Sequence, residues 1–307
     1  KKENSEYTGE AVNAELRHYY ESKLPLIKRS LTDLFPKKCT NNWVKALTGR
    51  EERPWDTDTL QVTFLDPINQ SIQQRKTFYY ALGSILLLES SSINPEKYLP
   101  LIGISEVFAG CLQLSKDISI HDNPGQLPLQ ELNIDNSIKA NAGVALLTLP
   151  YYPILHNYCN LDQEVRLWLF QNTTQSISRV FYANGTSQYR KNKSLNFLSS
   201  KEYAQESFYL NGSKLKFTFD LWLSLTRQYR SEEIVKSCEH ATRAFTLSYQ
   251  LAKDLNAFNR WLAENKQHRT APLNLTNNFI LLHIAEFSGV KDPIKLSQAE
   301  LIILFEE

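Results

Sequence analysis

The sequence predicts an all-α protein that forms one large single-domain helical bundle over residues 1–307. In most segments apolar side chains recur three or four positions apart, which is the spacing of one face of an α-helix. Short polar loops separate these segments, and only residues 47–70 could hold strands or form an irregular excursion. A chain of 307 residues that is 42% hydrophobic can also bury a sizeable core. Together these observations favour a helical bundle.

The first predicted helix covers residues 14–35, where an apolar face repeats at helical spacing through Leu16, Tyr20, Leu24, Ile27 and Leu31. Further helices are expected over residues 75–91, 104–119, 138–155, 162–182, 200–229, 232–266, 276–288 and 296–307. The segments 104–119 and 232–266 are apolar nearly all round, which is typical of buried central helices. Loops are predicted at residues 92–98, 121–136, 182–194 and 289–295.

The charge and the cysteine content narrow the function and the location. The 34 basic and 33 acidic residues nearly balance, so nucleic acid is not an expected partner. The four cysteines lie far apart with no CxxC pair, which predicts free thiols in a reducing compartment and hence a cytoplasmic protein. No run of about 18 apolar residues occurs. A transmembrane span is therefore not expected. Residues 1–10 lack an apolar core, so a signal peptide is not expected either.

Common catalytic motifs are absent from the sequence. It contains no GxSxG, HExxH, GxxxxGK[ST], GxGxxG or EF-hand loop. The six histidines are scattered without the spacing of metal ligands, and each is better explained as a helix-surface or core residue. Any chemistry is therefore expected in the two helices predicted to be central.

Each of these two helices carries a Lys-Asp pair in an otherwise apolar run. Lys116-Asp117 lies in LQLSKDISIHDNPGQ, and Lys253-Asp254 lies in YQLAKDLNAF. An ordinary interpretation remains open, in which the first pair is a polar step on a helix and Asp117 pairs locally with His121. The recurrence of the pair far downstream favours a shared role instead.

The first pair lies in a stretch with the spacing of an Asp-rich metal motif. This stretch, EVFAGCLQLSKDISIHD, begins at Glu106. Within it, Lys116 and Asp117 fall on the two leading positions of a DDxxD or DDxxxxD motif. Asp122 falls on the last Asp of the longer form, although the residues that follow it also make a good turn sequence.

Two further stretches follow in the same order as motifs of one known family. GVALL at residues 143–147 matches GDALL, and YQLAKDLNA at residues 249–257 matches FQxxDDxxD. On this ordered pattern the chain resembles the trans-isoprenyl diphosphate synthases, the polyprenyl synthetase family, over about residues 70–290. The resemblance implies a helical bundle around a central cavity and usually a dimer.

The resemblance also implies a chemistry and a set of site residues. Mg²⁺ ions would bridge an allylic diphosphate to the two acidic motifs, because hard oxygen ligands suit that metal. The catalytic positions are then Lys116, Asp117, Asp122, Lys253 and Asp254, with Asp117, Asp122 and Asp254 as metal ligands. The substrate-binding candidates are Arg75 and Lys76 in QQRKTF, Ser213 at the place of the family's KT dipeptide, and Gln250, which is equally well explained as a satisfied core amide.

The pattern departs from the family where the chemistry needs carboxylates. Lys116 and Lys253 replace the first Asp of each motif, and Ala257 replaces the last Asp of the second. A Lys within a few ångström repels a divalent cation by several kcal/mol at an effective dielectric of about 20. Metal-dependent condensation is therefore expected to be weak or lost. Lys116 could instead pair with Asp254, and Lys253 with Asp117, so that ion pairs fill the vacated metal site.

Three functions remain open from the sequence. The first is a divergent isoprenyl diphosphate synthase that uses Mg²⁺ and a prenyl diphosphate, with weak or altered prenyltransferase activity. The second is a catalytically inactive homologue, acting as the non-catalytic subunit of a heteromeric prenyl synthase or as a prenyl-binding protein. It would form a homodimer or a heterodimer with a catalytic homologue. The third is a helical interaction protein whose resemblance is accidental.

Overall fold

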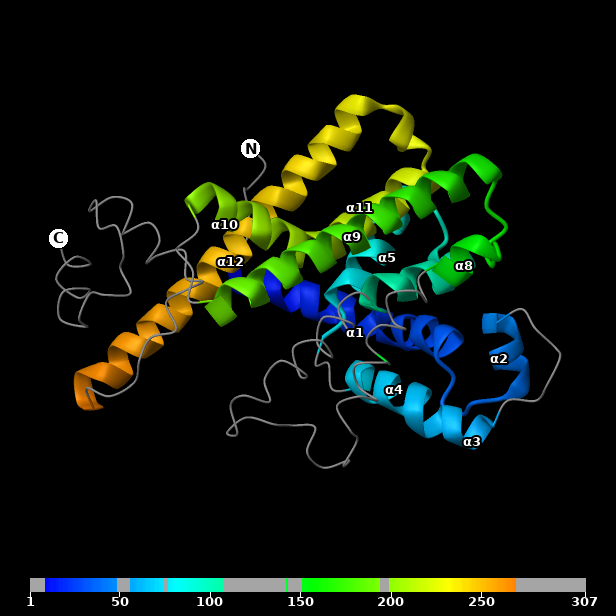
Figure 1. Ribbon diagram of the computed structural model, residues 1–307. Helices are drawn as coiled ribbons and strands as arrows, with labels where there is room; N and C mark the ends of the chain where they lie inside the picture. Colours follow the sequence, from blue (N-terminus) through cyan, green and yellow to red (C-terminus); the bar gives the residue numbers. More distant parts are fainter. Residues whose placement is uncertain are drawn as a thin grey trace, which may run out of the picture. The chain divides into compact units, whose positions relative to one another are not determined.

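The computed structural model describes residues 9–48, 56–73, 77–107, 142, 151–193 and 199–268. Within these ranges every regular element is a helix, so the prediction of an all-α chain is confirmed (Figure 1). In the same ranges no helix is long and apolar enough to cross a membrane.

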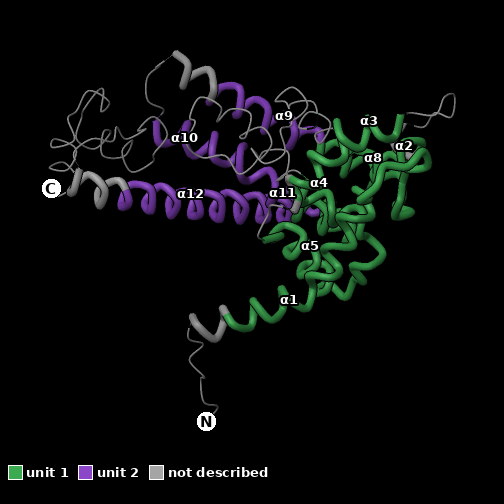
Figure 2. The backbone as a smooth tube through the Cα atoms, turned by 90° about the horizontal axis from the view of Figure 1, so that it is seen from below, with its two compact units in different colours: residues 1–173, 217–230 green, residues 174–216, 231–307 purple. Residues whose placement is uncertain are grey.

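The chain divides into two compact units (Figure 2). Unit 1 comprises residues 1–173 and 217–230, and unit 2 comprises residues 174–216 and 231–307. Both contain helices in their described parts. The single bundle around one central cavity stays a prediction.

Unit 1 contains the first half of the chain and one returning segment. Its elements are α1 (Gly9–Leu34), α2 (Asn41–Thr48), α3 (Thr57–Leu60), the π-helix η1 (Gln61–Leu65), α4 (Asp66–Gln73), α5 (Tyr79–Ser90), the 3₁₀-helix η2 (Pro95–Tyr98), α8 (Tyr151–Leu155), the start of α9 (Gln163–Lys193), most of α11 (Ser213–Leu225) and the 3₁₀-helix η6 (Gln228–Arg230). Its described core is largely aliphatic, and Ile27, Ile68, Ile85, Leu101 and Phe217 are all fully buried. Each such side chain contributes about 1.5–3 kcal/mol through removal from water.

The apolar face predicted for residues 14–35 is buried only in its C-terminal half. Ile27 and Leu31 of α1 are buried, whereas Leu16 is 51% exposed. A polar contact also fastens α1 to α5, because Tyr19 Oη donates to Glu89 at 2.9 Å and Lys23 pairs with the same carboxylate.

Residues 56–70 are helical and contain no strand. Asp56 caps α3 by accepting from the backbone N–H groups of Asp58 and Thr59, both at 3.1 Å. The chain then continues through η1 into α4 without a break. The possibility of strands or an irregular excursion in this segment is therefore wrong for the described residues. The stretch LQVTFL alternates apolar and polar residues as a strand would, but it forms a helix. Leu65 at its end and Ile68 in the next turn are buried.

Unit 2 contains the rest of α9, α10 (Ser200–Ser207), the π-helix η5 (Phe208–Gly212), the first residues of α11 and the long α12 (Glu232–His268). The loop predicted at residues 182–194 is wrong, because α9 continues as a helix to Lys193. The segment has no proline to stop the helix, and its single glycine weakens a helix without ending it.

α12 confirms the helix predicted over residues 232–266 but not its burial. Phe245 is 63% exposed and Tyr249 is 58% exposed, so the helix is not enclosed on all sides over its described side chains. Over the described side chains, the buried residues of α12 fall on one stripe that recurs every four residues, with Gln250 half-buried at its middle position. We call this the α12 stripe: Thr242, Thr246, Gln250, Asp254 and Phe258.

Candidate functional site

The second Lys-Asp pair lies on α12 with its two side chains on different faces. Asp254 is 5% exposed and belongs to the α12 stripe, whereas Lys253 is exposed. Successive residues on an α-helix are separated by about 100° around its axis, which accounts for this divergence. Ala257, at the third acidic position of the family motif, is also exposed. The retained carboxylate thus lies away from the two replaced positions.

Asp254 is held in a buried hydrogen-bond network of four side chains in unit 2. The Tyr203 hydroxyl of α10 donates to Asp254 Oδ2, and Gln250 Nε2 donates to Asp254 Oδ1 at 2.9 Å. Gln250 Nε2 also lies 3.0 Å from the Tyr203 oxygen. Asn211 Nδ2 of η5 donates to Gln250 Oε1 at 3.3 Å, which completes what we call the Asp254 network.

Local sequence positions these partners against α12. Ser199 and Glu202 form a capping box at the start of α10, and Tyr203 directly follows Glu202. Gly212 then allows η5 to approach α12 closely. A Cβ atom there would lie 2.6 Å from Phe208 Cδ2 and 2.9 Å from Thr246 Oγ1. The π-turn and the glycine together bring Asn211 within reach of the α12 stripe.

A second link between α10 and α12 lies beside the network. The Arg243 guanidinium donates to Gln205 Oε1 at 3.2 Å and pairs with Glu239 at 2.9 Å. It also lies 4.2 Å from the centre of the Phe208 ring, a cation–π distance. Burial raises the pKa of Glu239, but the hydrogen bond and charge of Arg243 outweigh it, and the net effect is a lowered pKa.

The electrostatics of the Asp254 network favour a neutral phenol beside the carboxyl group. Burial raises the pKa of Tyr203 above its usual value, and the hydrogen bond and charge of Asp254 raise it further. Tyr203 and Asp254 are 4% and 5% exposed, so a substrate in solution has little access to either. The arrangement suits a structural role more than proton transfer to a bound ligand.

This raised pKa predicts a specific loss of stability at alkaline pH. An unfolded tyrosine ionises near about pH 10, whereas folded Tyr203 keeps its proton to higher pH. Its contribution is therefore complete below that pH and falls as pH rises above it, because only the unfolded chain has released the proton. We expect the free energy of unfolding to fall more steeply between about pH 9 and pH 11 in wild type than in Tyr203→Phe. Urea titrations followed by circular dichroism would measure this, and parallel curves would contradict it.

Ser213, predicted to bind substrate, is 2% exposed and begins α11. Its hydroxyl donates to the backbone carbonyl of Tyr209 at 2.9 Å. Gln250 is a satisfied amide of the Asp254 network, as one of the two open interpretations held.

The other predicted site residues lie outside the described residues: Arg75, Lys76, Lys116, Asp117 and Asp122. The pairing of Lys116 with Asp254 and of Lys253 with Asp117 therefore stays a prediction. For the described partners, the structure gives Asp254 hydrogen bonds to Tyr203 and Gln250 and leaves Lys253 exposed.

Glu106, which begins the first motif stretch, is fully buried in unit 1. Its Oε1 accepts a hydrogen bond from the backbone N–H of Ala81 at 2.8 Å. Ala81 lies in the first turn of α5, where backbone N–H groups have no partner within the helix. Glu106 thus supports the start of α5.

Of the three predicted Mg²⁺ ligands, the described residues include Asp254 alone, whereas Asp117 and Asp122 lie outside them. A magnesium ion is commonly bound through one or two carboxylates plus substrate phosphates. Asp254 is the only carboxylate of the Asp254 network, and protein donors engage both of its oxygens. Across the described ranges, no three His, Cys, Asp or Glu side chains are grouped so that they could hold a metal ion.

Comparison with known proteins adds no family. Neither the models of protein families nor the curated proteins match this chain. The family suggested by the motif order therefore rests on the residues alone.

Tyr203 and Asn211 were not predicted from the sequence. Gln250 and Asp254, four residues apart in an apolar run, indicate that α12 buries polar groups that need partners. Nothing in the local sequence specifies which residues supply these partners. Tyr203, for example, lies 47 positions before Gln250 and 51 positions before Asp254.

Proposed function

We propose that this chain is a divergent relative of the trans-isoprenyl diphosphate synthases that binds a prenyl diphosphate or prenyl chain without catalysing metal-dependent condensation. The single observation that carries the loss of catalysis is the position of Asp254. Of the three acidic positions in the second motif it alone retains a carboxylate, and that carboxylate is bound by Tyr203 and Gln250.

Charge at the replaced positions supports the same proposal. The exposed positions of the motif carry the Lys253 ammonium and the Ala257 methyl group. An ammonium attracts a diphosphate but repels the divalent cation that the family uses to neutralise it. Such a surface favours metal-independent binding of an anion over ionisation of an allylic diphosphate.

A direct assay tests this proposal. The purified full chain is incubated with allylic and homoallylic diphosphates, with Mg²⁺ or with EDTA, and the products are separated by chain length. We expect no elongated product in either condition, and saturable binding of farnesyl diphosphate in EDTA by calorimetry. Elongated product that requires Mg²⁺ would refute the loss of catalysis, and absence of farnesyl diphosphate binding would refute the binding role.

A non-catalytic subunit of a heteromeric synthase is the second form of this proposal. The observation that favours it is the exposure of Phe245 and Tyr249, one turn apart on α12, because exposed large apolar groups often mark protein interfaces. In that case the same assay with a catalytic homologue added would give a different distribution of product lengths.

A further inference from the structure

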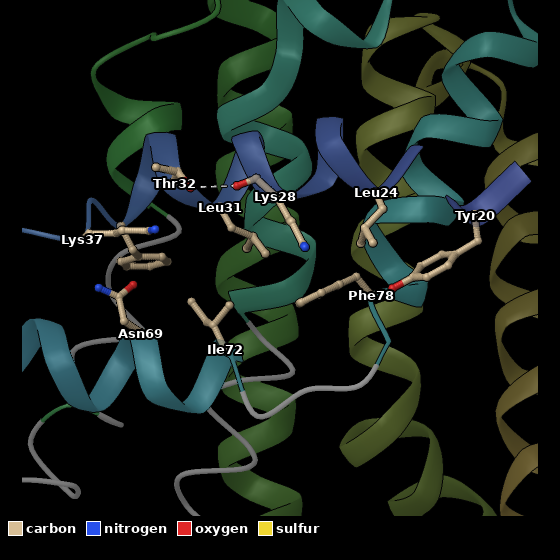
Figure 3. A pocket seen from close by; sticks show the side chains of 10 residues that line it. Tyr20, Leu24, Lys28, Leu31, Thr32, Lys37, Asn69, Ile72 and Phe78 are labelled. Atoms are coloured by element: carbon tan, nitrogen blue, oxygen red, sulfur yellow. Dashed lines mark hydrogen bonds between the residues drawn. The ribbon is translucent and has the colours of Figure 1, made fainter. Parts of the chain in front are cut away.

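Unit 1 contains a pocket in its described part that is separate from the Asp254 network. It has a volume of about 600 Å³ and lies between α1 and α4, with the start of α5 at one end (Figure 3). Ligand pockets of small molecules commonly measure about 300–1,000 Å³. The lining residues are Tyr20, Leu24, Lys28, Leu31, Thr32, Phe35, Lys37, Asn69, Ile72 and Phe78.

The described lining of this pocket has an apolar side and a polar side, and the apolar side is formed by Leu24, Leu31, Phe35, Ile72 and Phe78. Leu31, Phe35, Ile72 and Phe78 are each between 4% and 8% exposed, so these side chains are anchored in the core and present only part of their surface to the pocket. Water against this apolar side finds few hydrogen-bond partners. An aliphatic ligand would release that water and gain about 25 cal/mol for each Å² of apolar surface buried.

The charged residues of the lining are both basic. Figure 3 shows the side chains of Lys28 and Lys37 reaching toward the space between α1 and α4. Among the described lining residues there is no Asp or Glu. Within the part of the chain that the structure describes, neither ammonium forms an ion pair, whereas Lys23 on the same helix pairs with Glu89. The charge of the pocket is thus complementary to an anion.

The end of the pocket that carries Lys37 is held in place by hydrogen bonds. Gln61 Nε2 donates to the Lys37 carbonyl at 3.2 Å, and Gln61 Oε1 accepts from the Cys39 N–H at 2.5 Å. Asn69 Nδ2 donates to the Pro36 carbonyl at 3.1 Å. These contacts fasten the segment after α1 to η1 and α4, so little ordering is left for a ligand to impose.

We propose that this pocket binds an aliphatic anion, with the acidic head at Lys28 and Lys37 and the chain against Leu31, Ile72 and Phe78. Fatty acids and prenyl phosphates share this chemistry. The inference goes beyond the proposed function, whose loss of catalysis rests on Asp254, and Phe78 is the one described lining residue that belongs to a motif stretch, QQRKTF.

Binding to the full-length chain in EDTA tests the proposal. The probes are dodecanoate and farnesyl diphosphate as anions, dodecanol as the neutral chain and dodecylamine as the cationic chain. We expect saturable calorimetric binding of at least one anion, with the neutral and cationic chains at least tenfold weaker. Equal binding of dodecylamine and the better anion would overturn the proposal, as would failure of both anions to bind.

Matched variants locate the binding. Lys28→Gln with Lys37→Gln should weaken the bound anion at least tenfold, which corresponds to about 1.4 kcal/mol. Arg29→Gln with Lys38→Gln removes the same charge from adjacent exposed positions that do not line the pocket, and should leave affinity within about twofold. An unchanged affinity for every bound anion in the first double variant would overturn the proposal.

The two anions separate this proposal from the proposed function. If the first double variant loses dodecanoate but keeps farnesyl diphosphate, the pocket binds acyl anions and the prenyl group binds elsewhere. If it loses farnesyl diphosphate, the pocket is the prenyl site. If it keeps farnesyl diphosphate and dodecanoate never binds, the pocket proposal fails while the proposed function stands.

Discussion

Replacing Asp254 by alanine should lower the free energy of unfolding by about 3 kcal/mol, because the Tyr203 hydroxyl and the Gln250 amide would lose a buried acceptor. Each buried donor left without a partner costs about 1–3 kcal/mol. Asp254→Asn keeps the volume and one acceptor oxygen, so its loss should be smaller, about half as large. Urea unfolding at neutral pH, followed by circular dichroism, would measure both.

The neighbouring lysine supplies the control. Lys253→Ala changes an exposed residue of the same helix and should alter the free energy of unfolding by less than about 0.5 kcal/mol. If Asp254→Ala were as stable as Lys253→Ala, the Asp254 network would not hold α12, and a catalytic reason for the retained carboxylate would have to be considered again.

Replacing Gly103 by alanine should destabilise unit 1 by about 2 kcal/mol, because the helical residues 99–107 pack directly on the backbone of α1. A Cβ atom at residue 103 would lie 2.8 Å from the Ser30 carbonyl oxygen and 2.6 Å from Leu34 Cδ1. The oxygen belongs to the backbone and cannot move without shifting α1. The clash should outweigh the helix propensity of alanine, which favours the substitution by about 1 kcal/mol.

Gly185 is the matched control for this substitution. It also lies within a helix, α9, but a Cβ atom there has no other atom within 4 Å. Gly185→Ala should therefore raise the free energy of unfolding by about 0.5–1 kcal/mol. Thermal and urea unfolding of the two variants should shift in opposite directions. A shift in the same direction would show that the contact on α1, or the helical state of residue 185, is not as described.

Helix spacing accounts for most of what could be predicted about the fold. The helices predicted over residues 14–35 and 232–266 correspond to α1 and α12. Apolar repeats of three and four residues indicate a helix whatever other elements it packs against. Burial was harder to predict. α12 looked enclosed because Phe245, Tyr249 and Leu255 are apolar, yet all three are exposed. The sequence shows which side chains are apolar, but it does not show which of them pack against another part of the chain.

The polar site shows the same limit in another form. The position of Asp254 within a family motif suggested a metal ligand, and the sequence offered no sign of Tyr203. A partner about fifty residues away is chosen by how α10 and η5 fold back on α12, which depends on the π-turn and on Gly212. The loop prediction for residues 182–194 was wrong for a simpler reason. Polar residues and one glycine are compatible with an exposed stretch of helix as well as with a loop.

The four-residue repeat of the α12 stripe has a consequence for how the helix finds its place. A shift of α12 along its axis by four residues, about 6 Å, would move Thr246 to the level of Gln250 and Gln250 to the level of Asp254. Apolar packing alone would distinguish these registers poorly, because equivalent positions recur at every turn. Only one register presents a carboxylate to Tyr203 and an amide to Asn211. The buried acid thereby favours a single alignment of α12.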